Sequence, residues 1–191
     1  MLLRQHSFTL FKIVIGILIF IAASIASTYI YFIPLKNTFT SIYPGLIYTC
    51  ATVIVFLLFN KITSLLKLVY YLCLMVVTYY IIWVATIYSS YVAFIVGIFT
   101  AGIGSLTTFF LADKFITKIS FNKRNVFIIG GLSFLVTDIL LFSWNSVYDK
   151  PPIEYIFKLP YSSDPIYGEV IFFWQLFVGI KFVLTVRKTN Q

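Results

Sequence analysis

The chain has 191 residues, of which 61% are hydrophobic and only 10% are charged, whereas a typical soluble domain is about a quarter charged. Its mean hydropathy of +1.00 leaves too little polar surface to face water on all sides. These values exclude an ordinary soluble globular protein and predict an all-α integral membrane protein. With one histidine and two cysteines in the whole chain, we expect no metal centre, no disulfide framework and no cofactor.

Uncharged runs set the number of predicted transmembrane helices, because a helix needs about 20 apolar residues to cross the hydrocarbon core. The run from Leu68 to Ala112 is about twice too long for one crossing. We therefore expect it to reverse at Tyr88–Tyr91, the sequence YSSY, where serines favour a turn and tyrosines favour the interface. The chain then forms a single domain of six predicted spans, at residues 13–33, 43–60, 68–87, 92–111, 126–143 and 170–186.

The start of the first span also has features of a secretory signal. Arg4 and Lys12 precede an apolar run, and the segment AASIAS offers small residues at a plausible cleavage point. The run continues through TYIYFI, which makes it longer than a signal-peptide core. We favour a helix that is retained.

The basic residues are unevenly distributed between the two ends of the predicted spans. Three would lie outside, at Lys36, Lys150 and Lys158, and Lys181 lies within the last span. The other ten would lie on the opposite side: Arg4, Lys12, Lys61, Lys67, Lys114, Lys118, Lys123, Arg124, Arg187 and Lys188. The positive-inside rule therefore predicts cytoplasmic N- and C-termini in a multi-pass protein of the cell (inner) membrane.

The positive charge flanks the spans and does not cluster with aromatic residues on a soluble face. Orientation and contact with anionic lipid explain it, so we expect the lipid bilayer and not nucleic acid as the partner. The loop at residues 112–125 concentrates Lys118, Lys123 and Arg124. We expect these three residues to dock a protein partner or lipid on the cytoplasmic side.

Small residues four positions apart indicate where helices touch, because close backbone approach drives helix association in lipid. In the fourth span Gly97, Ala101 and Ser105 have this spacing, with Gly104 beside them. This predicts a central helix that packs inside the bundle. A homo-oligomer interface would use the same pattern.

Two charged residues, Asp138 and Lys181, fall within predicted spans, where ionisable groups are expensive. Lys181 is close enough to the cytoplasmic end to extend its ammonium to the headgroups. Counting residues from the cytoplasmic ends places Gln175 at the same depth as Asp138. We expect Asp138 and Gln175 to hydrogen-bond between spans five and six, with Thr137 and Trp174 nearby. This polar site would serve either as a clamp between helices or as a proton or ligand site.

Aromatic residues occupy two further regions of interest. Tyr79, Tyr80 and Trp83 fall within the third span, where they would either pack the bundle or line a cavity for an apolar ligand. The outer loop at 144–169 holds four of the six prolines, which prevent a continuous helix. This loop would either read an external ligand or partner, or cap the bundle.

The chemistry needed for catalysis is missing from the sequence. The single histidine, His6, lies outside the spans, so no serine–histidine pair is available within them. Asp138 has no second acid at its depth to form a paired-carboxylate site, because Asp113 is at the cytoplasmic boundary. We therefore expect no catalytic residue and no enzymatic activity.

These patterns favour a non-enzymatic, membrane-embedded component of a multi-protein bacterial system. The abundance of Phe, Tyr, Ile, Lys and Asn resembles the products of AT-rich accessory genes, such as antiphage-defence or toxin-immunity membrane proteins. The alternative is a small-molecule transporter or substrate-binding subunit that uses Asp138. A third reading, suggested by the aromatic spans, is a protein that handles lipid or polyprenyl carriers.

Overall fold

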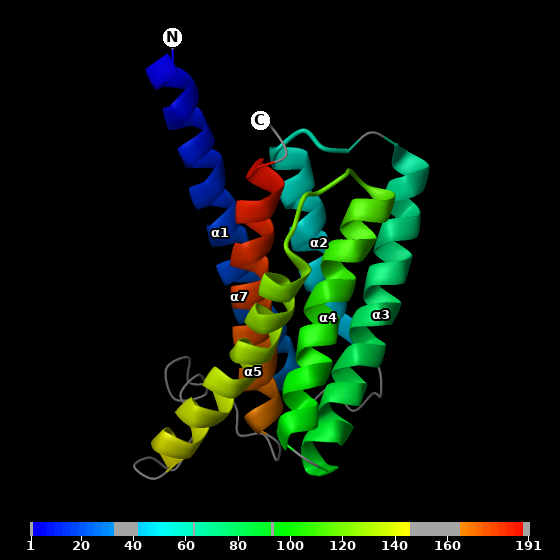
Figure 1. The fold of residues 1–191 in the computed structure, drawn as a ribbon, viewed down its shortest axis with the longest axis vertical. Helices are drawn as coiled ribbons and strands as arrows, with labels where there is room; N and C mark the ends of the chain where they lie inside the picture. Colours follow the sequence, from blue (N-terminus) through cyan, green and yellow to red (C-terminus); the bar gives the residue numbers. More distant parts are fainter. Residues whose placement is uncertain (1, 33–41, 63, 93, 146–164, 189–191) are drawn as a thin grey trace.

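The structure is a computed structural model that describes residues 2–32, 42–62, 64–92, 94–145 and 165–188. At several helix ends, and at Asp138, it describes the backbone alone. Within these ranges all regular structure is α-helical (Figure 1). The helices are α1 (Leu2–Phe32), α2 (Ile42–Leu58), α3 (Leu65–Val92), α4 (Phe94–Phe115), α5 (Lys123–Asn145) and α7 (Pro165–Lys188).

Three helices in the described ranges are long and apolar enough to cross a membrane. The qualifying stretches are Thr9–Ile30 in α1, Leu65–Thr86 in α3 and Ile95–Phe115 in α4. Ile42–Leu58 and Val170–Val186 are shorter apolar helices. The expected all-α class and an association with the membrane therefore hold.

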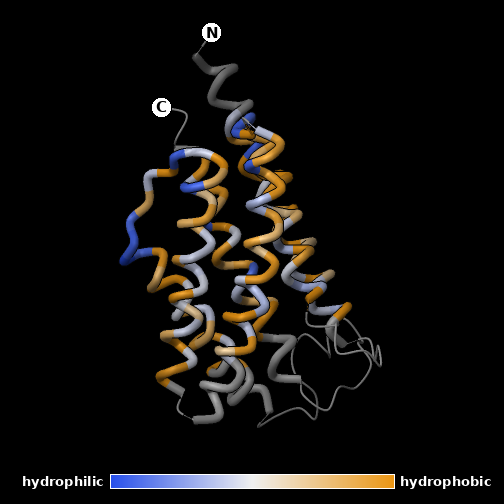
Figure 2. The backbone as a smooth tube through the Cα atoms, turned by 90° about the vertical axis from the view of Figure 1, so that its right-hand side faces the viewer, coloured by the Kyte–Doolittle hydropathy of each residue, from blue (hydrophilic) through white to orange (hydrophobic). Residues whose placement is uncertain are grey.

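The helices are arranged as a ring in which each packs against the next along the chain, and α7 closes the ring on α1. Across the ring, α7 also contacts α2 and α4. The helices alternate in direction, so the N and C labels lie at the same end of the bundle in Figure 1. The α2–α3 and α4–α5 connections lie at this end as well, and the most hydrophilic stretches lie toward it (Figure 2).

The helix bounds differ from the predicted spans at several places. Helix α3 continues through Tyr88–Tyr91 to Val92, so the prediction of a reversal within that tetrapeptide is wrong, and α4 begins at Phe94. In lipid every backbone N–H and C=O needs a partner, and a helix supplies one even for turn-forming serines. Helix α7 begins at Pro165, a residue suited to a first helical turn, within the segment predicted as the outer loop. Residues 146–164 of that loop lie outside the described part of the chain.

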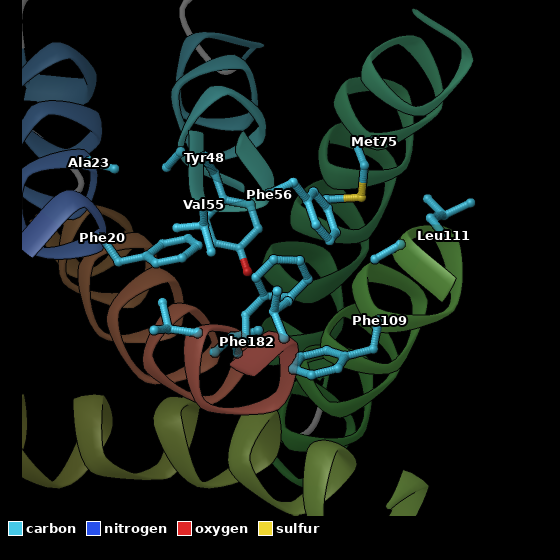
Figure 3. Close-up of a cluster of buried hydrophobic side chains, with 14 of the residues drawn as sticks. Phe20, Ala23, Tyr48, Val55, Phe56, Met75, Phe109, Leu111 and Phe182 are labelled. Carbon is cyan, nitrogen blue, oxygen red and sulfur yellow. The ribbon is translucent and has the colours of Figure 1, made fainter. Parts of the chain in front are cut away.

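The centre of the ring is filled by aromatic side chains around Phe182 of α7 (Figure 3). Its ring centroid lies 6.2 Å from that of Phe20 in α1, 5.1 Å from Phe56 in α2 and 5.4 Å from Phe109 in α4. All four side chains are fully buried. Edge-to-face contacts of this kind hold four helices together at one point.

Helix α5 packs on the side of α4 that carries Gly97, Ala101 and Ser105. A Cβ built on Gly130 of α5 would lie 2.6 Å from the Ala101 carbonyl oxygen and would also overlap Ser105 Oγ. The Ser105 hydroxyl donates to the Val126 carbonyl of α5 at 2.8 Å. The small residues therefore allow the two backbones to approach closely.

Gly104 of α4 faces a different pair of helices. A Cβ built there would lie 2.7 Å from Ile82 Cγ2 on α3 and 3.3 Å from Trp174 Cζ2 on α7. The residues predicted as one packing set thus lie on two faces of α4. One face meets α5, and the other faces α3 and α7.

Candidate functional site

The most connected polar residue inside the bundle is Gln175 of α7, which is fully buried. Its Nε2 donates to the Pro44 carbonyl of α2 at 3.1 Å and to the Tyr79 hydroxyl of α3 at 2.8 Å. Glutamine suits this place because its amide nitrogen carries two protons. One side chain therefore connects three helices.

Three aromatic rings surround this amide. Tyr48 of α2, Tyr79 of α3 and Trp174 of α7 form a triangle with centroid separations of 5.4 to 5.8 Å. The indole Nε1 of Trp174 donates to the Ala101 carbonyl of α4 at 3.0 Å. The cluster thus holds α2, α3, α4 and α7 in register. We call Tyr48, Tyr79, Trp174 and Gln175 the polar centre.

The polar centre contains an unused acceptor. Gln175 Oε1 is buried and accepts no hydrogen bond from the residues that the structure describes. A buried amide oxygen without a donor costs free energy relative to the same group in water. The position would therefore gain from a donor, such as a water molecule or a polar group of a ligand.

A cavity lies beside the polar centre, between α3, α4 and α7. Its volume is about 40 Å³, counted as the space open to the centre of a water molecule. Its walls are almost entirely apolar, and it is partly open. Helix α3 contributes Tyr79 and Trp83, α4 contributes Gly104, and α7 contributes Trp174. Of the aromatic residues predicted to line a cavity or pack the bundle, Tyr80 points outward and is exposed.

The predicted partners of Asp138 lie in different surroundings. The Thr137 hydroxyl is buried and donates to the Ser133 carbonyl of its own helix at 2.8 Å. Both amide protons of Gln175 go to acceptors on α2 and α3, so the expected hydrogen bond with Asp138 would have to use Oε1. The side chain of Asp138 lies outside the described part of the structure, and its role stays a prediction.

A second candidate site is the connection between α4 and α5, which is folded tightly against the bundle. The Asp113 carboxylate accepts a hydrogen bond from the backbone N–H of Ile119 at 2.7 Å. Ile116 and Ile119 are buried, and the Phe121 ring lies 5.4 Å from that of Phe109. The loop is therefore anchored at both of its ends.

Of the predicted docking residues, Lys118 lies in this anchored loop, and Lys123 and Arg124 lie in the first turn of α5 that follows it. Lys118, Lys123 and Arg124 are all exposed, and we call these three residues the basic surface. The apolar anchors between them hold it in one shape. The three positive charges are therefore presented on an ordered surface.

Sequence reasoning missed Tyr79 as the partner of Gln175 and missed the anchoring role of Asp113. The available signal for Tyr79 was a phenol placed in mid-span, which needs a polar partner when buried. No comparable signal marked the Pro44 carbonyl, because backbone acceptors carry no sequence signature. Comparisons with protein-family models, curated proteins and solved structures gave no match for this chain.

Proposed function

We propose that this chain crosses the bacterial inner membrane six times, with both termini in the cytoplasm. We further propose that it acts without catalysis as the membrane-embedded component of a multi-protein system. The arrangement of the helices supports the proposed topology, since the start of α1, the end of α7 and the α2–α3 and α4–α5 connections all lie at one end of the bundle. The basic residues of those connections favour the cytoplasm for that end.

The observation that carries the proposed docking role is the anchored basic surface. A protein partner pays less entropy to bind a surface that is already ordered. Three exposed cations on this loop and the first turn of α5 also complement an acidic patch and steer encounter with it. Lys114 lies in the last turn of α4 and adds a fourth positive charge near this surface.

The kind of system is proposed from composition. The Phe-, Tyr- and Ile-rich composition of this chain resembles that of small multi-pass proteins in antiphage defence and toxin immunity. In either setting the membrane protein would hold a cytoplasmic partner at the bilayer.

Charge reversal on the basic surface tests this function. The variant Lys118→Glu, Lys123→Glu, Arg124→Glu should lose partners that co-purify with the tagged wild-type protein after cross-linking in cells. The matched control reverses Lys36, Lys150 and Lys158, which lie on the opposite side in the proposed topology. A reporter fused to the C-terminus of each variant checks that the orientation is unchanged. Equal recovery of partners from both variants would contradict the docking role, and a reporter at residue 118 facing outward would contradict the topology.

A second candidate function is the binding or transport of a small ligand, as the substrate-binding subunit of a carrier. The cavity beside a buried polar centre favours it. In this case Asp138→Asn should abolish uptake or ligand binding while the amount of folded protein stays the same. Unchanged uptake in that variant would remove Asp138 from the transport hypothesis.

A further inference from the structure

We propose that the cavity between α3, α4 and α7 binds a single hydrocarbon chain of a bilayer lipid. This inference rests on the proposed insertion of the bundle in a membrane, and it is independent of the partner that docks on the basic surface. The cavity involves no residue of that surface.

The chemistry of the walls selects for hydrocarbon. Several polar groups that line the cavity already have internal partners. Thr86 Oγ1 donates to the Ile82 carbonyl at 2.8 Å, and Thr108 Oγ1 donates to the Gly104 carbonyl at 3.1 Å. The Trp174 indole is bonded to Ala101, and the Tyr79 hydroxyl accepts from Gln175. A polar solute would lose its own hydrogen bonds on entry to these walls, whereas a hydrocarbon chain loses none.

The size of the cavity limits what can enter it. At Gly104, which lines the cavity, Ile82 of α3 already packs closely, since a Cβ there would lie 2.7 Å from Ile82 Cγ2. A volume of about 40 Å³ on this measure exceeds the roughly 10–15 Å³ that one water molecule requires. Water molecules in an apolar cavity of this kind would find few hydrogen-bond partners and would stabilise it little. The narrow end of a flexible chain fits it, whereas a bulky ring system does not.

One wall of the cavity belongs to a helix that would face lipid. Helix α3 lies at the rim of the bundle, and only 17% of its apolar window is buried. Val77 and Ile81, on the outer side of α3, are 56% and 58% exposed. The cavity is partly open, and Thr78, Ile82 and Trp83, which line it from α3, are only half-buried. Acyl chains would therefore be the neighbours of this wall.

Tryptophan fluorescence tests the proposal directly, because Trp174 lines the cavity and is 9% exposed. The variant Trp83→Phe, Trp144→Phe leaves Trp174 as the single tryptophan, which is excited at a wavelength that tyrosine does not absorb. This protein is reconstituted in vesicles of phosphatidylcholine that carries two bromine atoms in one acyl chain, and in vesicles of the unbrominated lipid. Flotation of the vesicles first confirms insertion. Bromine in an entering chain quenches the indole.

Two further substitutions separate entry into the cavity from contact at the outer surface. Thr78→Phe adds bulk to a residue that lines the cavity, and Val77→Phe adds the same bulk to the adjacent residue on the outer side of α3. We expect Thr78→Phe to lose most of the bromine quenching and Val77→Phe to retain it.

The remaining outcomes contradict the proposal in distinguishable ways. Equal quenching in the two variants, or none in the parent protein, would show that no chain enters. Strong quenching by aqueous acrylamide would show a water-filled cavity instead. Failure of the protein to float with the vesicles would overturn the membrane insertion itself, and with it this inference.

Discussion

Gln175 of α7 donates a hydrogen bond to the hydroxyl of Tyr79 on α3, at 2.8 Å. In the ring of helices α3 has α2 and α4 as neighbours, and α7 has α5 and α1. This bond therefore joins two helices that are not adjacent in the ring. It passes beside the cavity that the same two helices enclose.

Gln175→Leu should destabilise the bundle by about 1 kcal/mol, because it removes two interhelical hydrogen bonds inside the membrane. Tyr79→Phe should cost less, since Nε2 keeps the Pro44 carbonyl as acceptor. The free energy of unfolding is measured in mixed micelles of mild detergent and dodecyl sulfate. The double variant should lose less free energy of unfolding than the sum of the losses in the two single variants, because both substitutions remove the same hydrogen bond. Strict additivity would show that the two side chains are not coupled.

Gly130→Ala should destabilise the protein by about 1–3 kcal/mol, because the added methyl group meets the Ala101 carbonyl oxygen and Ser105. The matched control is Gly16→Ala on α1, where the nearest atoms are side-chain methyls of Val183 at 3.0 and 3.1 Å. These methyls can rotate away, whereas a backbone carbonyl cannot. Thermal unfolding in detergent should rank Gly130→Ala as the less stable variant. The reverse order would be inconsistent with the α4–α5 contact.

Asp113→Ala should loosen the loop between α4 and α5, because it removes the acceptor for the Ile119 N–H. We expect faster cleavage by trypsin after Lys118, an exposed residue of this loop, and a loss of stability of about 1 kcal/mol. Asp113→Asn retains a carbonyl oxygen and should behave nearly as the wild type. Cleavage at equal rates in the wild type and Asp113→Ala would mean that this bond does not order the loop.

Cys50 of α2 and Cys73 of α3 are free thiols exposed on the outside of the bundle. In a bilayer these surfaces would face hydrocarbon, which a charged reagent does not enter. We expect neither residue to react with a charged maleimide in intact vesicles, and both to react after denaturation. Mass spectrometry counts the added groups. Labelling in intact vesicles would show that water reaches these helix faces.

The existence of the helices could be predicted from apolar runs bounded by charges, because the bilayer requires continuous helices of a minimum length. The residues at which these helices begin and end could not be predicted in this way. Tyr88–Tyr91 is composed of residues that favour turns and interfaces, yet α3 continues through it because the helix satisfies its backbone groups. Proline at position 165 was assigned to the loop, although proline is acceptable where a helix begins.

The candidate site could be predicted only in part, for a geometric reason. Counting residues along a span gives the depth of Gln175, and this singled it out as an intramembrane polar residue. It does not give the rotation of the helix about its axis, and successive residues differ by about 100° in direction. Rotation and packing place the Gln175 amide against α2 and α3, while Trp174 reaches α4. The small-residue pattern of α4 likewise predicted which residues make close contacts. It could not predict which helices they contact.

The closure of the ring on α1 also determines the order in which this protein can assemble during translation. The Phe20 ring of α1 lies against Gly179 of α7, and Gly16 lies against Val183. Helix α1 leaves the ribosome before α7, so this face of α1 stays uncovered while every intervening helix is synthesised. Until α7 arrives, the nascent chain is an open stack whose aromatic face is available to lipid, to the insertion machinery or to another protein.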